Sequence, residues 1–215
     1  MEPEKTRGLF ITVEGLEGCG KSTNLKFIES LLRNAGVNLC CTREPGGTPL
    51  AESLRALLLA NREEPVDENA ELLMVFAARA QHLNQVIVPS LESGQWVLCD
   101  RFTDATYAYQ GAGRGLSTDV IASLETIVQK GRQPDITFFL DLDVEQGLAR
   151  AKARGELDRF EREQISFFEN VRKGYWQRID QQPERFIVID AGVSLEQVQA
   201  QISTKLDEIL QGLSL

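Results

Sequence analysis

The stretch GLEGCGKST, residues 15–23, decides the fold, and it comes directly after the apolar run LFITVE. Gly15, Gly20, Lys21 and Ser22 satisfy G-x-x-x-x-G-K-[ST], the pattern of a phosphate-binding loop. Glycines let the backbone wrap so that successive N–H groups point inward and form a site for an anion. A flexible surface loop is the alternative interpretation. The apolar run before the loop and the helical pattern after it favour strand, loop and helix, which is the context that the motif requires.

Each residue type in the loop has a physical reason. Lys21 is long enough to reach the β- and γ-phosphates of a nucleotide, and the hydroxyl of Ser22 is a ligand for Mg²⁺. The helix that follows adds its positive N-terminal end. The loop residues expected to contact the nucleotide are Gly15, Leu16, Glu17, Gly18, Cys19, Gly20, Lys21, Ser22 and Thr23.

The bulk properties limit the class of protein. A length of 215 residues fits one α/β domain, and the formal charge of −9 argues against a nucleic-acid surface, which needs a basic stripe. The four cysteines lack disulfide-framework or zinc spacing, which predicts reduced thiols in a cytoplasmic protein. The polar start has no apolar signal region, and no stretch approaches membrane-spanning length, so we expect no membrane partner.

Five strand-like runs alternate with helical stretches. The strands are predicted at 9–14, 37–42, 95–100, 136–142 and 185–190, and the helices near 22–35, 49–60, 67–92, 117–130, 144–153, 160–181 and 194–211. Most of the strands are continuously apolar, as in a parallel sheet covered on both faces. The pattern predicts a doubly wound five-stranded parallel sheet with helices on both faces. Residues 8–215 then form a single domain after a polar extension at residues 1–7.

Charged residues follow two of these strands, at the sheet edge where such folds bind ligands. Asp100 closes an apolar strand, as does the acidic partner of a phosphate loop that holds Mg²⁺; a turn residue is the alternative. Arg101 next to it suits an anionic substrate, since arginine binds phosphate bidentately, unless it makes only a surface ion pair. Arg43 and Glu44 precede Pro-Gly-Gly, so either substrate contact or a plain turn is open.

Two further segments carry candidate residues. Phe76 and Arg79 are three apart on the long helix and share a face, which suits a nucleobase, although core packing beside a surface charge is the alternative. Arg150 and Arg154 are one helical turn apart and precede Gly155. This basic run is either a solvated face or a lid, at about residues 148–162, that brings cations to a transferring phosphoryl group.

Four motifs in the same order carry a family resemblance. GLEGCGKST, REPGGT, DRFTDATYAYQGAGRG and RAKARGELDRFE together resemble the bacterial thymidylate kinases, from about residue 8 to the C-terminus. The resemblance implies a P-loop kinase that transfers the γ-phosphoryl group of ATP to dTMP, giving dTDP and ADP for DNA synthesis. It also implies Mg²⁺ and a homodimer built partly on the long helix.

The resemblance also implies roles for individual residues. Lys21, Arg101, Glu17, Arg154 and Arg150 would be catalytic, and Ser22 and Asp100 would hold the metal. The dTMP-binding residues would be Arg43, Glu44, Phe76, Arg79, Arg101, Thr106, Tyr109 and Gln110. Among these, Phe76 would stack on thymine, Arg79 would bond its O4, and Tyr109 would lie under the deoxyribose and disfavour a 2′-hydroxyl.

Two alternatives stay open at this point. The first is another P-loop kinase that acts on a different monophosphate or small molecule. The second is a GTP-dependent switch, but such proteins usually read guanine with N-K-x-D, which this sequence lacks.

Overall fold

The computed structural model describes residues 7–153 and 158–212. Its centre is a sheet of five parallel strands in the order β2-β3-β1-β4-β5. The strands are β1 (Phe10–Gly15), β2 (Leu39–Arg43), β3 (Trp96–Asp100), β4 (Ile136–Asp141) and β5 (Phe186–Asp190). The order reverses on either side of β1, so the crossovers leave in both directions, and the doubly wound sheet predicted from the sequence is confirmed.

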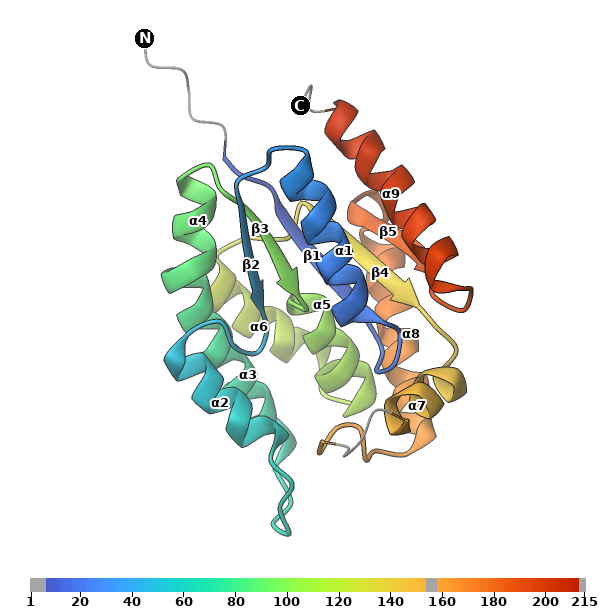
Figure 1. The fold of residues 1–215 in the computed structure, drawn as a ribbon. Coiled ribbons are helices and arrows are strands. Elements are labelled where there is room, and N and C mark those ends of the chain that lie inside the picture. Colours follow the sequence, from blue (N-terminus) through green and yellow to red (C-terminus); the bar gives the residue numbers. More distant parts are fainter. Residues whose placement is uncertain (1–6, 154–157, 213–215) are drawn as a thin grey trace.

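Helices cover both faces of this sheet (Figure 1). They are α1 (Lys21–Asn34), α2 (Pro49–Leu59), α3 (Glu68–His82), the π-helix η1 (Leu83–Ile87), α4 (Val88–Glu92), α5 (Thr103–Thr106), the π-helix η2 (Tyr107–Gly113), α6 (Thr118–Gln129), α7 (Val144–Lys152), α8 (Ile165–Gln181), the 3₁₀-helix η3 (Pro183–Arg185) and α9 (Leu195–Gly212). Helices α1 and α9 pack on one face, and η2 and α8 pack on the other.

Side-chain alternation along the strands explains why the strands are apolar throughout. Ile11 and Val13 of β1 join the core beneath α1 and α9, whereas Phe10 packs edge-to-face on Phe102 at the opposite face. All four of these side chains are buried, because each face of the strand has its own layer of helices.

The helical region between β3 and α6 was not predicted from the sequence. Residues 103–113 form α5 and η2, although they contain two glycines. Helix η2 packs closely on α8 at Gly174, where an added Cβ would lie 2.7 Å from the Cβ of Ala112 and 2.9 Å from the Cα of Ala108. This close approach compensates for the weak helix propensity of the glycine-containing segment.

The carboxyl ends of the parallel strands meet at one edge of the sheet, and the loop between β1 and α1 lies there. Among the described helices, none has both the length and the apolar character that a membrane crossing needs.

Candidate active site

The phosphate loop is held in shape by backbone that only glycine adopts readily. Gly18 and Gly20 have φ angles of +74° and +86°. A Cβ on Gly18 would lie 2.0 Å from the carbonyl oxygen of Gly147, because the loop rests directly on α7. The Nζ of Lys21 donates to the carbonyl oxygens of Gly15 and Leu16, at 3.0 and 2.9 Å. The ammonium group therefore lies across the mouth of its own loop.

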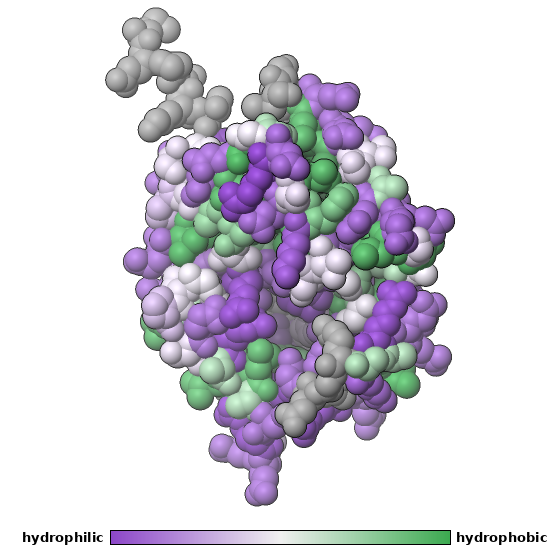
Figure 2. All heavy atoms as spheres, in the orientation of Figure 1, coloured by the Kyte–Doolittle hydropathy of each residue, from purple (hydrophilic) through white to green (hydrophobic). Residues whose placement is uncertain are grey.

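A cavity of about 470 Å³ begins at this loop and continues beneath α2 and α3. Figure 2, drawn in the orientation of Figure 1, shows a hollow on this face of the molecule, with hydrophilic side chains around its opening. The predicted site residues that line the cavity are Glu17, Gly18, Gly20, Lys21, Ser22, Thr23, Glu44, Arg79, Asp100, Arg101, Thr106, Tyr109, Gln110 and Arg150. The cavity thus joins the phosphate loop to polar groups on α3, α5 and η2.

Arg101 lies at the middle of the cavity in an unusual backbone conformation. Its φ angle is +67°, which is uncommon for a residue with a side chain and is often found at functional sites. One guanidinium nitrogen donates to Glu17 at 2.8 Å, and the other to the hydroxyl of Tyr175 at 3.0 Å. The guanidinium carbon lies 4.7 Å from the ring centre of Tyr109, whose hydroxyl donates to Glu17. These contacts fix a cation beside the phosphate loop.

Arg79 forms the far end of the cavity and is almost completely buried. Its Nε donates to Glu44 at 2.7 Å, and one terminal nitrogen donates to the Phe102 carbonyl and to Thr106. The other terminal nitrogen, NH1, has no hydrogen-bond partner within the described residues. His82 supports this arrangement from below, because its Nδ1 lies 3.0 Å from the second carboxylate oxygen of Glu44. The sequence interpretation gave His82 no role.

Phe76 does not line the cavity, although it was predicted to stack on a base. Its ring packs with Leu72 and Ile121, and the guanidinium of Arg79 lies 5.0 Å from its centre. Val75, one residue earlier, lines the cavity instead. Helical spacing explains the difference, because i, i+3 and i, i+4 neighbours of Arg79 lie on adjacent parts of one face.

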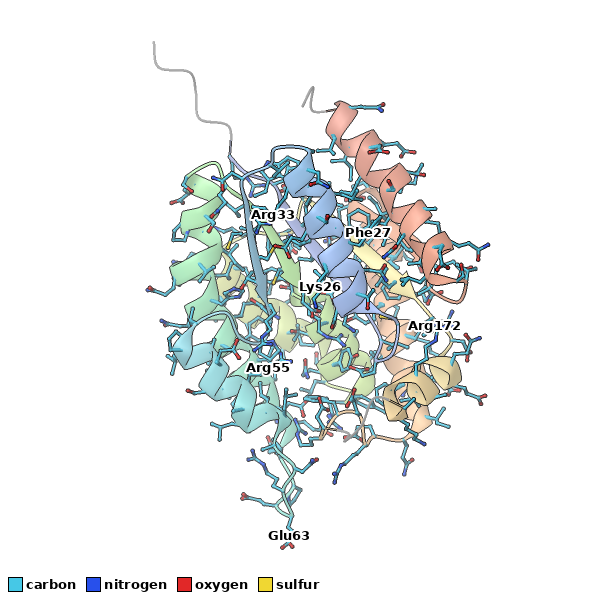
Figure 3. All side chains as sticks on the ribbon, in the orientation of Figure 1. Lys26, Phe27, Arg33, Arg55, Glu63 and Arg172 are labelled. Atoms are coloured by element: carbon cyan, nitrogen blue, oxygen red, sulfur yellow. The ribbon has the colours of Figure 1, made fainter. Side chains whose placement is uncertain are left out.

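Arg43 does not line this cavity either. It pairs with Glu52 at 2.8 Å, and half of its side chain is exposed. Arg55, labelled beside α2 in Figure 3, lines the cavity and donates to the Pro45 carbonyl at 2.9 Å. Burial, and next the nearby charge of Arg43, lower the pKa of Arg55, so an anion placed here would relieve charge repulsion. No motif in the sequence marks Arg55.

Asp100 and Ser22 meet the requirements of a magnesium site. Both line the cavity, and the Oδ1 of Asp100 is buried with no hydrogen-bond partner in the part of the chain that the structure describes. Over residues 7–153 and 158–212 no cluster of three or more His, Cys, Asp or Glu could hold a metal by itself. Mg²⁺ usually takes one or two protein oxygens together with waters and substrate phosphates, so this sparse donor set fits it.

The predicted lid is described only in part. Arg150 lines the cavity and donates to the Ala191 carbonyl at 3.2 Å, whereas Arg154 lies outside the described residues. After the gap, Asp158, Phe160 and Glu161 line the cavity, and the sequence interpretation had not singled them out. All three lie within the motif RAKARGELDRFE, so the sequence identified the segment but not these individual residues.

A family model described as thymidylate kinase matches residues 13–202. The chain belongs to the thymidylate kinase family. It is 66% identical over 203 residues to the thymidylate kinase of Teredinibacter turnerae, covering 94% of this chain and 99% of the relative. It is 60% identical to that of Ectopseudomonas mendocina, covering 95% and 97%. The crystal structure of thymidylate kinase from Ehrlichia chaffeensis is 35% identical and superposes with a TM-score of 0.75 over 94% of this chain and 99% of that one.

Proposed function

We propose that this chain is an ATP-dependent dTMP kinase, which transfers the γ-phosphoryl group of ATP to dTMP and releases dTDP and ADP. The observation that carries the proposal is the single cavity that joins Lys21 of the phosphate loop to the buried Arg79. With the ATP phosphates at the Lys21 end and the thymine of dTMP at the Arg79 end, the phosphate of dTMP would lie near Arg101, between the two ends. Membership of the thymidylate kinase family supports this choice of substrates.

At the donor end, the loop amides and the N-terminus of α1 bind the ATP phosphates. Lys21 exchanges its two carbonyl contacts for phosphate oxygens, because an anion is a better partner for an ammonium group than a neutral carbonyl. Ser22 and the Oδ1 of Asp100, which has no hydrogen-bond partner among the described residues, would hold Mg²⁺ directly or through water. When bound, Mg²⁺ neutralises charge on the phosphates.

At the centre, Arg101 and Arg55 bind the dTMP phosphate, and Glu17 keeps the guanidinium of Arg101 in place. The acceptor is already an anion, so the reaction needs no general base. The phosphoryl group passes through a loose transition state whose charge must be balanced, and these cations, with Arg150 at the lid, supply the balance.

At the base end, Arg79 offers NH1, which has no partner in the described part of the chain, and Thr106 and Gln110 also line the cavity. Val75 provides an aliphatic surface for the thymine ring, in place of the predicted ring of Phe76. Tyr109 lies under the sugar, where its ring leaves little room for a 2′-hydroxyl.

The acceptor decides between this function and its rivals. A coupled assay of ADP release with ATP should give turnover with dTMP well above that with dCMP, dGMP or AMP. Comparable turnover with a purine monophosphate would favour another P-loop kinase, and ADP release independent of any acceptor would contradict a kinase of monophosphates.

The proposal extends to a homodimer formed by α2, α3 and α6. Helix α3 packs between α2 and α6, and each helix leaves a large apolar side chain in solvent: Leu57 at 51%, Leu73 at 56% and Ile127 at 68% exposure. A second copy would cover these side chains. The cytoplasmic location and the absence of a nucleic-acid partner stay predictions of the sequence.

A further inference from the structure

Glu71 is a buried carboxylate behind the base end of the cavity, and nothing above gives it a function. It lies in the first turn of α3, is 1% exposed and does not line the cavity. Three donors converge on it, two from η2 and its C-terminal cap and one from the segment before α8. They are the Nε2 of Gln110 at 2.8 Å, a terminal nitrogen of Arg159 at 2.7 Å and the Nε of Arg114 at 3.3 Å.

The carboxylate determines which way the Gln110 amide points. An ionised carboxylate only accepts hydrogen bonds, and two guanidinium groups balance the charge of Glu71. Gln110 must therefore turn its NH₂ toward Glu71, because the reverse orientation would place two acceptor oxygens against each other. The carbonyl oxygen, Oε1, is then the end of the amide that remains for the cavity, which Gln110 lines.

The neighbouring group on the same wall is a donor. The NH1 of Arg79 is buried without a partner within the described residues, while its other nitrogens are held by Glu44, Phe102 and Thr106. The wall thus offers a donor beside an acceptor. Thymine carries the complementary pair, the O4 acceptor beside the N3–H donor, whereas cytosine carries an amino donor beside an acceptor nitrogen.

We propose that Glu71 is a positioning residue for pyrimidine choice: it fixes the Gln110 amide so that the cavity accepts a 4-keto pyrimidine and rejects a 4-amino pyrimidine. The inference rests on the proposed dTMP kinase function. With cytosine, the Arg79 donor would face the donor 4-amino group, and the Gln110 acceptor would face the acceptor N3. A site built to hydrogen-bond one pattern rejects the opposite pattern strongly, by about 10²-fold or more.

The test is the ratio of kcat/KM for dTMP to that for dCMP in the wild type and in Glu71→Gln. A glutamine of the same shape offers either end of its own amide, so Gln110 is free to invert. We expect the ratio to fall by about 10-fold or more, through a gain of dCMP turnover. The matched control is Arg114→Gln, which removes a guanidinium from the same Glu71 oxygen and leaves the carboxylate to orient Gln110. Its ratio should stay within about twofold of the wild type.

Several outcomes would overturn the inference. It is wrong if Glu71→Gln turns over dTMP but keeps the wild-type ratio, or if Arg114→Gln loses the ratio equally. A binding measurement on the wild type covers the case in which Glu71→Gln does not fold: dTMP methylated at N3 should bind at least about 10-fold more weakly than dTMP. Equal binding would show that no acceptor faces N3. A wild-type enzyme inactive on dTMP would instead refute the proposed function.

Discussion

At the scale of single residues, Lys21 gives the plainest test of the phosphate site. Among the described residues, its Nζ donates to two carbonyl oxygens of its own loop and otherwise only to the Cys19 sulfur, at 3.9 Å. Lys21→Ala should therefore lower kcat by about 10²-fold or more, the size of losing one donor to the transferring group. The melting temperature should change little. Steady-state kinetics measure kcat, and thermal melting measures the stability of the fold. A near-normal kcat would refute the phosphate-loop assignment.

Glu14 predicts an unusual dependence of stability on pH. It is fully buried, and burial, then the nearby Asp104 carboxylate, raise the pKa of Glu14 from 4.5 to about 7, against the opposing charge of Arg101. Between these two pKa values the folded state holds a proton that the unfolded state has lost, so this group makes stability fall as the pH rises from about 4.5 to about 7. Glu14→Gln removes this titration. The free energy of unfolding of the variant should therefore rise relative to that of the wild type by about 1 kcal/mol per pH unit between pH 4.5 and pH 7.

Urea unfolding at pH 5, 6, 7 and 8 measures the difference. Above pH 7 the gap should level off, because both states of the wild type are then ionised. Glu29→Gln is the control: Glu29 is at the surface, and its hydrogen bond with Arg33 lowers its pKa, so it should show no trend over this range. A gap that is constant with pH for Glu14→Gln would show that its carboxyl group is not perturbed.

The residues of the candidate site were predictable where a motif fixes their spacing. Gly18, Gly20, Lys21, Asp100 and Arg101 meet at one cavity because the ends of adjacent parallel strands must lie side by side. Spacing alone could not separate Val75 from Phe76 on one helical face, nor show that Arg55 reaches the cavity while Arg43 pairs with Glu52. Those choices depend on how α2 and α3 pack.

At the scale of secondary structure, apolar runs and β-α alternation predicted all five strands within two residues at each end. The helices α5 and η2 escaped prediction, because their glycines and short length carry little local signal. Their formation depends on a long-range contact with α8 that local propensity does not contain.

That contact can be tested at Gly174. Alanine is the better helix former, but here its Cβ would lie 2.7 Å from the Ala112 Cβ and 2.9 Å from the Ala108 backbone, so the clash should outweigh propensity. Gly174→Ala should cost about 1–3 kcal/mol and raise the dTMP KM, because η2 carries Tyr109. Denaturant unfolding and kinetics measure the two effects. Gly212→Ala, at the end of α9 with open space around it, is the control and should be neutral; equal losses in both variants would contradict the packing argument.

At the scale of the whole molecule, the cavity is bounded by two kinds of structure. The edge of the sheet fixes the phosphate loop and Arg101, and the helical layer of α2, α3 and η2 fixes the base end. The relative placement of the two substrates therefore depends on how firmly this helical layer packs on the sheet.

The proposed dimer would brace that layer from outside. Leu73→Glu places a charge in the exposed apolar stripe of α3, and we expect it to convert the dimer to a monomer with an intact fold. Light scattering after size exclusion gives the mass, and circular dichroism checks the fold. Val188→Glu, at an exposed position on β5 far from these helices, should leave the mass unchanged. A wild type that is monomeric at micromolar concentration would refute the dimer.

The contact between Gly18 and Gly147 links the nucleotide to the local unfolding of α7. The loop backbone rests on this helix with no room for a side chain at either glycine, so the loop cannot change its shape without moving the helix start. Nucleotide binding stabilises the ordered loop, and the loop keeps this shape only while α7 is folded. Binding of the nucleotide and local unfolding of α7 are therefore thermodynamically linked, so a bound nucleotide should suppress transient opening of α7. Amide hydrogen exchange along α7 should accordingly slow when ATP is added, with no direct contact between ATP and most of those amides.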